Sequence, residues 1–408
     1  MKIALLAYYF SPDQSIGAIR PGNWARWLSS DHEVSVITKP CIQDRDDGVG
    51  FKVLRPNSLS IRILDKLNSY RKGRRLRDQA QSTFLGNSPK KSGPPSGVFT
   101  YRFPCFFDLW IFAALRALKA SRPDVVVATH SPYVTLVAAW RYALFNPKVK
   151  LWVDFRDLWA GNHLAVGVWG LRWIERLLER LILKRADVIT TVSEGLADYF
   201  RGKGHAGKVF VIHNAPMQED LAAAVNECGA EADRSGPAVT LCYTGTIYPG
   251  WRDPSPLFSL VRDIGVASPD CSFVVASRNV GDLFSLADQY GVRDFIDFRG
   301  EVSRVEAMRM QSSCSVLVML ESGRPEAKGV LTGKVFEYLA TEKPILVIGP
   351  GPDSELYRLI DSHDRLMTLE ELKEIILGHK VLRTCRAFDY SVISSRKVQS
   401  VAASFAGQ

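Results

Sequence analysis

A chain of 408 residues, 46% hydrophobic and 23% charged, has the composition of a folded protein, excludes extensive disorder and is long enough for two domains of about 200 residues each. Its net charge of +9 is uneven, because residues 1–210 hold 32 Lys and Arg against 17 Asp and Glu, whereas residues 211–408 hold 20 against 26. We therefore expect only the first half to face an anionic partner, either nucleic acid or anionic lipid.

In the first half, short apolar segments alternate with helical patterns, which predicts a parallel sheet with crossover helices. The apolar start at 2–9 is interpreted as a buried strand and not as a signal peptide, because Ser11-Pro12-Asp13 follows it without a small-residue cleavage site. Further strands are expected at 33–38, 51–55, 124–129, 149–154, 187–192 and 208–213, and helices at 18–30, 108–121, 133–144, 169–186 and 194–203.

An insertion at about 56–112 interrupts this alternation. It holds nine Lys and Arg between 62 and 91 and then an aromatic-rich stretch at 99–112. A basic stretch beside an aromatic one suits an element that meets anionic headgroups and inserts rings at their boundary. A solvated basic loop leading into a core helix has the same composition, so both interpretations stay open. No stretch approaches the roughly 20 apolar residues of a membrane span.

The second half repeats the alternation after a linker at 214–237, which is rich in Ala, Glu, Asp and Gly. The pattern predicts an α/β chain with two Rossmann-like domains, one at 1–213 and one at 238–388. In the second domain strands are expected at 238–244, 272–277, 295–299, 315–320 and 344–348, and helices near 256–266, 281–290, 303–312, 331–341 and 353–361.

Neither a metal nor a bound cofactor is expected. The seven cysteines are scattered, odd in number and without a Cys-x-x-Cys pair, which fits reduced thiols better than disulfides or a metal cluster. Asp44-Arg45-Asp46 spells the Asp-x-Asp of metal-dependent transferases, but it lies in a polar loop away from the nucleotide-site candidates. The absence of Gly-x-Gly-x-x-Gly argues against a nicotinamide or flavin enzyme.

In the first domain, polar residues follow the expected strands where open α/β sheets bind ligands. His130 follows the strand at 124–129, and Arg156 and Asp157 follow the strand at 149–154; all three are catalytic candidates. Gly17 opens the helix at 18–30, where backbone N–H groups can approach an anion, and it is grouped with the donor-site candidates. A structural histidine and an ordinary glycine turn remain the alternatives.

In the second domain, the strongest local feature is the run from Leu331 to Glu337. Gly333 leads into a helix whose first N–H groups can meet a diphosphate, Thr332 can cap or bind phosphate, and Lys334 adds a positive charge. Glu337 lies one turn further on, where a carboxylate can accept both hydroxyls of a ribose. An ordinary helix start with an exposed glutamate is the alternative.

Two more strand ends are candidates for the nucleotide site. Gly245 and Thr246 follow the strand at 238–244, with Arg252 in reach of phosphate oxygens. The strand at 295–299 is followed by residues that could pair a nucleobase through their backbone, namely Gly300, Glu301 and Val302.

Together these motifs make the chain resemble a retaining glycosyltransferase of family 4 with the GT-B architecture, closest to enzymes that build O-antigen, capsule and exopolysaccharide repeats. The resemblance covers nearly the whole length. Its motifs are Tyr9-Phe10-Ser11-Pro12 with Gly17, then 188–194, 211–215, Tyr243-Thr244-Gly245, Arg299-Gly300-Glu301-Val302 and 334–339.

The resemblance implies that the second domain binds a nucleotide-diphosphate sugar, with UDP favoured over GDP, and that the first binds a lipid-linked or surface-polysaccharide acceptor. It implies that a C-terminal helix at 389–408 crosses back to the first domain. The family's phosphate-binding cations correspond to Arg252 and to Lys334 or Arg278. The chain departs from the family at Gly329, where a first glutamate is usual, and in the single glycine of its first loop.

The expected activity is therefore transfer of a hexosyl or N-acetylhexosaminyl group, at the inner, cytoplasmic face of a membrane. A nucleotide-sugar epimerase or a phosphorylase of the same architecture is the enzymatic alternative, because a fold does not fix a function. A noncatalytic glycan-binding protein is the other alternative. Nucleic acid is disfavoured as a partner, because no recognition motif accompanies the basic residues.

Overall fold

The computed structural model describes residues 1–13, 15–41, 50–57, 106–161, 170–222, 239–247, 250–265, 271–278, 283–324, 329 and 331–406. The basic residues between 62 and 91, Asp44-Arg45-Asp46 and most of the expected linker lie outside these described residues. The chain forms two compact units. Unit 1 comprises Met1–Val192, Ala197–Ile212 and Ser395–Gln408, and unit 2 comprises Ser193–Leu196 and His213–Ser394.

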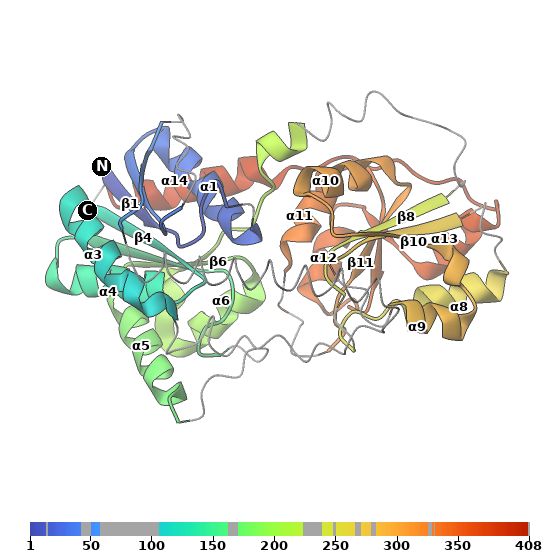
Figure 1. The fold of residues 1–408 in the computed structure, drawn as a ribbon, viewed down its shortest axis with the longest axis horizontal. Coiled ribbons are helices and arrows are strands. Elements are labelled where there is room, and N and C mark those ends of the chain that lie inside the picture. The colour runs from blue at the N-terminus through green and yellow to red at the C-terminus, as the bar shows by residue number, and fades with distance from the viewer. Residues whose placement is uncertain are drawn as a thin grey trace, which may run out of the picture. The chain divides into compact units, whose positions relative to one another are not determined.

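Unit 1 is built on a sheet of seven parallel strands in the order β3-β2-β1-β4-β5-β6-β7 (Figure 1). The central strands are buried along nearly their whole length, as expected for a parallel sheet covered on both faces. The strands are β1 (Lys2–Leu6), β2 (Glu33–Ile37), β3 (Lys52–Leu54), β4 (Val125–His130), β5 (Lys150–Phe155), β6 (Val188–Thr191) and β7 (Val209–Val211).

Helices cover both faces of this sheet, and alternate residues of each strand enter two separate cores. In β1, Ala4 and Leu6 pack with α3, α4 and α5, whereas Ile3 and Leu5 pack with α1 and α14. The helices are α1 (Ile16–Ser29), α3 (Trp110–Ser121), α4 (Val134–Phe145), α5 (Arg172–Arg185), α6 (Glu194–Phe200) and α14 (Tyr390–Ala403), and η2 (Phe106–Leu109) leads into α3.

A buried ion pair ties α1 to the carboxyl half of β5. Asp154 is fully buried and accepts from Arg20 Nε at 2.9 Å and Nη2 at 2.8 Å. The hydroxyls of Thr129 and Thr190, on the strands either side, donate to the same carboxylate at 2.9 and 2.8 Å. The buried carboxylate of Asp154 is therefore paired with the charge of Arg20 and hydrogen-bonded by both threonines. A charged group in a low-dielectric interior is stable only with such partners.

Unit 2 has a sheet of six parallel strands in the order β10-β9-β8-β11-β12-β13. Three of its helices begin with side-chain caps, since Ser303, Ser354 and Thr368 each accept from the backbone N–H three residues on. The elements are β8 (Val239–Thr244), α8 (Ser255–Ile264), β9 (Cys271–Ala276), α9 (Leu283–Tyr290), β10 (Ile296–Gly300), α10 (Arg304–Ser313), β11 (Val316–Leu320), α11 (Gly333–Leu339), β12 (Ile345–Ile348), α12 (Glu355–Asp361), β13 (Leu366–Met367) and α13 (Leu369–Ile376).

The predicted α/β class with two Rossmann-like domains is confirmed, and each strand expected from the sequence is present within a few residues. The short strand β13 and the helix α13 were not expected. For β13 the reason is that two apolar residues are too few to form a recognisable pattern. Among the described helices, none combines the length and the apolar character needed to cross a membrane.

The ion pair inside unit 1 gives a stability prediction. Asp154→Ala removes the carboxylate that neutralises the buried guanidinium of Arg20, so we expect the free energy of unfolding to fall by about 3–5 kcal/mol in urea titrations. The matched control is Asp198→Ala, because its pair with Arg201 is exposed and should contribute less than about 1 kcal/mol. Equal effects of the two variants would contradict the assignment of the buried pair as a main stabilising contact.

Candidate functional site

In unit 2 the strand order reverses between β8 and β11, which is where open α/β sheets bind ligands beyond the carboxyl ends of their strands. Gly245 directly follows β8, Glu321 directly follows β11, and α11 begins nearby at Gly333. Gly245 has φ +146° and donates its N–H to Ala276 O, at the end of β9, at 2.8 Å. The strands β8, β9 and β11 therefore end around this switch point, and α11 begins there.

A carboxylate not expected from the sequence organises the switch point. Glu321 accepts from Arg252 Nε at 3.2 Å and from Arg252 Nη2 at 2.9 and 3.0 Å. The remaining guanidinium nitrogen, Nη1, donates to Thr246 O at 2.8 Å. The side chains of Arg252 and Glu321 are largely buried, so the fork of Arg252 is held in a fixed orientation beside the glycine turn.

Lys334 brings a second cation to the same place from the first turn of α11. Its Nζ lies 3.9 Å from Glu321 Oε1, donates to Tyr243 Oη at 3.2 Å and lies 4.5 Å from the centre of that ring. Glycine suits the position of Gly245 because L residues rarely adopt φ +146°, and a Cβ here would also come within 2.7 Å of Lys334 Nζ and displace it. Burial, with the neighbouring positive charge of Arg252, lowers the pKa of Lys334 to about 8.

The start of α11 adds an unsatisfied hydroxyl. Thr332 occupies the N-cap position, yet its side chain makes no capping hydrogen bond. Its Oγ1 is buried without a hydrogen-bond partner among the described residues. Leu331, before it, is buried and fixes the entry into the helix. Thr332 Oγ1 and the first N–H groups of α11 are thus available to an acceptor-rich group such as phosphate.

Glu337 lies one turn into α11 and takes part in a buried polar network. Its Oε1 is 2.8 Å from Arg304 Nη1, and its Oε2 accepts from Gln311 Nε2 at 3.4 Å. Gln311 also donates to Thr244 Oγ1 at 2.8 Å, which connects Glu337 to the end of β8. A carboxylate has about four lone-pair positions, so these two contacts leave room for further donors.

The other nucleotide-site candidates lie at the ends of β9 and β10, further along the same sheet edge. Arg278 and Glu301 form an exposed ion pair at 2.8 Å, and Ser277 N donates to Gly300 O at 2.8 Å. Val302 lines a separate hollow of about 380 Å³ beside α10. These residues therefore surround the edge of the sheet but do not contact the cations at the switch point.

In unit 1 the corresponding switch point lies between β1 and β4, and it brings together three of the predicted residues. The guanidinium of Arg156 donates to Gly17 O at 2.7 Å, to Ser131 O at 2.9 Å and to His130 O. His130 is buried, with its ring 6.0 Å from that of Phe155. Arg156 therefore fixes the loops around His130 and Gly17, which makes it a positioning residue in this structure.

Asp157 and Gly17 need separate mention. Asp157 follows Arg156 at the end of β5, and its side chain is exposed. Gly17, which the sequence grouped with the donor site, lies in unit 1 against Tyr9, where an added Cβ would come within 3.2 Å of Tyr9 Cδ2. The remaining donor-site candidates all belong to unit 2.

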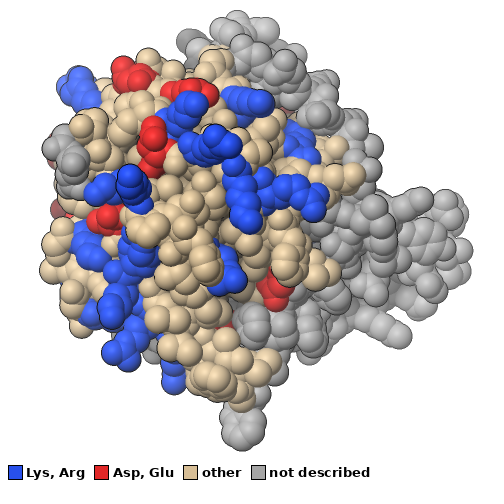
Figure 2. Space-filling model, turned by 90° about the vertical axis from the view of Figure 1, so that its left-hand side faces the viewer, with Lys and Arg blue, Asp and Glu red and all other residues tan. Residues whose placement is uncertain are grey.

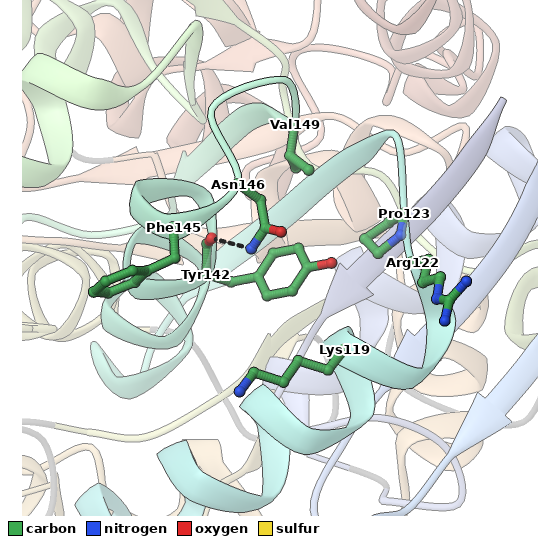
Figure 3. Close-up of a pocket in the computed structure, with 7 residues that line it drawn as sticks. All are labelled: Lys119, Arg122, Pro123, Tyr142, Phe145, Asn146 and Val149. Carbon is green, nitrogen blue, oxygen red and sulfur yellow. Dashed lines mark hydrogen bonds between the residues drawn. The ribbon is translucent and has the colours of Figure 1, made fainter.

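One hollow of unit 1 does not coincide with either switch point. It measures about 530 Å³ and lies where α3 and α4 end and β4 and β5 begin, at the amino edge of the sheet in unit 1 (Figure 3). None of its seven lining residues was a site candidate. They are Lys119, Arg122, Pro123, Tyr142, Phe145, Asn146 and Val149.

Sequence reasoning missed Glu321, Arg304 and Gln311. Glu321 carried a usable signal, because it directly follows a buried strand, as Arg156 does. Arg304 and Gln311 lie on α10 and reach Glu337 only through the fold, so no spacing in the sequence marks them. Among the described residues, no group of three or more His, Cys, Asp or Glu side chains is arranged to hold a metal ion.

Comparisons with known proteins agree with this architecture. Residues 18–215 match the family model described as a glycosyl transferase 4-like domain. No curated protein matches the chain in sequence.

Solved structures resemble the chain over nearly its whole length at low sequence identity. Sucrose-phosphate synthase from Thermosynechococcus elongatus superposes with a TM-score of 0.56 and 14% identity, and the match covers 100% of both chains. Anabaena HepE, solved with UDP and glucose, has a TM-score of 0.53 and 12% identity over 99% of this chain and 100% of its own. UDP-GlcNAc 2-epimerase from Methanocaldococcus jannaschii has a TM-score of 0.51 and 11% identity, with the same coverage. The chain therefore has a glycosyltransferase-like GT-B fold.

The pKa of Lys334 offers a direct test of the geometry at the unit 2 switch point. Glu321 favours the charged form of Lys334 against the effects of burial and Arg252, so Glu321→Gln should lower the pKa of Lys334 further below about 8. NMR titration of labelled lysine side chains would measure this value. Glu301→Gln is the control, since Glu301 pairs with Arg278. An unchanged pKa in Glu321→Gln would show that this carboxylate does not act on Lys334.

Proposed function

We propose that this protein is a glycosyltransferase that moves a sugar from a UDP-sugar, or alternatively a GDP-sugar, onto a lipid-linked or surface-polysaccharide acceptor. The observation that carries the proposal is the convergence of Arg252 and Lys334 at the switch point of unit 2, beside the glycine turn at Gly245. The match of residues 18–215 to a glycosyl transferase 4-like domain supports the same activity. The transferred group is of the hexosyl or N-acetylhexosaminyl class.

Breaking the bond between the sugar and the diphosphate leaves negative charge on the departing phosphate oxygens. Fixed cations and N–H groups that face this charge stabilise the transition state without reorganising during the reaction. Arg252 and Lys334 supply two positive charges, and Thr332 Oγ1 with the first turn of α11 supplies donors. In this mechanism no metal is required to neutralise the leaving group, and no cofactor takes part.

Glu337 completes the donor site by accepting the ribose hydroxyls of the nucleotide. Its contacts with Arg304 and Gln311 orient the carboxylate on the first turns of α11. At the edge of the sheet, the backbone from Gly300, the last residue of β10, to Val302 pairs the base. Arg278 is the alternative to Lys334 as a phosphate-binding cation, because its exposed side chain can change its rotamer.

Unit 1 supplies the acceptor side in this proposal. His130, at the end of β4, is the candidate that acts on the acceptor hydroxyl, and Asp157 lies one strand along the same sheet edge. Arg156 positions His130 through the carbonyls of His130, Ser131 and Gly17. Retention of configuration at the anomeric carbon is proposed from the family resemblance alone.

Partners and location follow from charge. The excess of positive charge in residues 1–210 and its absence from residues 211–408 favour an anionic lipid surface as the partner of the first half. We place the protein at the inner face of a membrane, bound peripherally, where lipid-linked acceptors are found. Nucleic acid is not proposed as a partner.

The second candidate is a nucleotide-sugar epimerase or phosphorylase, because an epimerase of this fold superposes on the chain. A noncatalytic glycan-binding protein is the third. Incubating the protein with labelled UDP-sugars, with and without a bacterial lipid extract, distinguishes these candidate functions. A transferase yields a labelled lipid and free UDP only when the extract is present. An epimerase converts the sugar without any acceptor, and a binding protein changes nothing.

Affinity for UDP tests the role of Glu337. Because hydrogen bonds to a charged group contribute about 1.5–3 kcal/mol, Glu337→Ala should weaken UDP binding by about 10- to 100-fold in calorimetry. Glu306→Ala is the matched control, since its carboxylate pairs only with Arg309 on the same helix in the described contacts. If Glu337→Ala binds UDP as the wild type does, Glu337 has no place in the donor site.

Turnover tests the role of His130. A general acid or base contributes about 10²–10⁴-fold, so His130→Ala should lower kcat by at least about 100-fold while UDP affinity stays within about threefold. His379→Ala, at an exposed position of unit 2, is the control and should retain full turnover. If His130→Ala keeps the wild-type kcat, His130 has a purely structural role.

A further inference from the structure

Helix α5 exposes two parallel rows of side chains, each with a spacing of four residues. The first row is basic and the second is apolar: Arg172, Arg176, Arg180 and Lys184, and beside them Trp173, Leu177 and Leu181. The two carboxylates of the helix, Glu175 and Glu179, are buried on the opposite face, where Glu179 pairs with Lys203 at 2.6 Å. The outward side of α5 therefore carries no negative charge.

This arrangement does not stabilise the isolated protein. Like charges four residues apart on a helix repel each other, and the two carboxylates of α5 are buried away from the outward side, with Glu179 paired to Lys203. Trp173 is 61% exposed, so a large apolar ring remains in contact with water. Both features become favourable at the boundary of an anionic bilayer, where apolar side chains leave water and cations meet phosphates.

The neighbouring helices extend the same pattern. Helix α4 packs against both α3 and α5, and Arg185 at the end of α5 donates to Val149 O, beyond the end of α4, at 2.7 Å. No acidic residue occurs in α3 or α4. Their exposed side chains longer than alanine are Phe112, Arg116 and Lys119 on α3 and Arg141, Leu144 and Phe145 on α4. Figure 2 shows Lys and Arg spread over the end of unit 1 where α3 and α4 lie in Figure 1, with few Asp or Glu.

A basic hollow lies at one end of this α3–α5 surface (Figure 3). Lys119 and Arg122 come from the last turn and the C-cap of α3, and the ring of Tyr142 forms the wall between them and α4. Arg122 adopts φ +45°, a left-handed conformation in which glycine is the usual residue. Arg122 and Lys119 thus add two positive charges to the lining of a hollow of about 530 Å³, which is large enough for a headgroup phosphate.

We propose that the α3–α5 surface docks the protein on an anionic lipid bilayer, with α5 lying along the headgroup layer. The apolar row of α5 inserts toward the acyl chains, the basic row contacts lipid phosphates, and the hollow at Lys119 and Arg122 takes a headgroup. A second copy of the chain does not fit, because the many cations of this surface would repel each other. The proposal rests on the proposed function for its lipid-linked acceptor, but its surface is independent of the donor site.

Vesicle sedimentation tests the proposal. The wild-type protein should bind phosphatidylcholine vesicles that contain phosphatidylglycerol at least about tenfold more tightly than pure phosphatidylcholine vesicles. Replacing the basic row by Ser should remove this preference. Trp173→Ser/Leu177→Ser/Leu181→Ser should abolish the part of the binding that survives high salt, because ring insertion is hydrophobic whereas charge attraction is screened.

Matched controls use the same chemistry on unit 2. Serine at Arg262, Arg309, Lys373 and Lys380 removes four exposed cations, and serine at Leu377, Val381 and Val392 removes three exposed apolar side chains. Both controls should bind vesicles as the wild type does. UDP affinity, measured by calorimetry, should be the same in all variants, so a failure of the donor site would be seen separately.

Two results of the vesicle assay would overturn the proposal, and so would one result of analytical ultracentrifugation. One is wild-type vesicle binding in both α5 variants, which would move the contact to the basic residues between 62 and 91. The other is a wild-type protein that ignores anionic vesicles at low salt. If the apolar-row variant instead dissociates a dimer seen by analytical ultracentrifugation, the surface is an interface between copies and the lipid proposal fails.

Discussion

The carboxylate of Glu321 holds two mutually repelling cations at the carboxyl edge of the second sheet, and the candidate donor site depends on that contact. Arg252 binds it through two nitrogens, and Lys334 lies 3.9 Å away. Burial and the positive charge of Arg252 lower the pKa of Lys334 to about 8, because the single negative charge of Glu321 does not offset both effects. An anionic ligand at this point relieves the repulsion, so the site is prepared for a diphosphate before one arrives.

The scaffold around this contact is rigid for reasons that lie outside the site. The C-terminal end of α11 is held by Arg365, which is fully buried and donates to the carbonyls of Leu339, Thr341 and Lys343. Main-chain carbonyls at a helix C-terminus favour a cation, so this arginine fixes the axis that carries Lys334. Unit 1 has a similar arrangement, since the guanidinium of Arg156 donates hydrogen bonds to three main-chain carbonyls around the switch point of that sheet.

Much of the fold and part of the site could be predicted from the sequence, and the division has a physical cause. Buried parallel strands are continuous apolar runs, so β4 and β11 were recognisable, and residues that follow such strands reach the sheet edge. Glu321 was missed because its partners, Arg252 and Lys334, become neighbours only through the order of β8 and β11. The two rows of α5 repeat every four residues, but which side faces solvent depends on how α5 packs on the sheet.

The most direct test of the proposed donor site compares the affinity of the protein for a nucleoside diphosphate with its affinity for the nucleoside alone. In calorimetry the wild-type protein should bind UDP at least about 100-fold more tightly than uridine, since two charge-assisted contacts are involved. In Arg252→Gln/Lys334→Gln that ratio should fall below about tenfold, whereas Arg262→Gln/Lys373→Gln, with the same change in charge at exposed positions, should keep the wild-type ratio. A ratio that survives the loss of Arg252 and Lys334 would contradict the claim that these two cations bind the diphosphate.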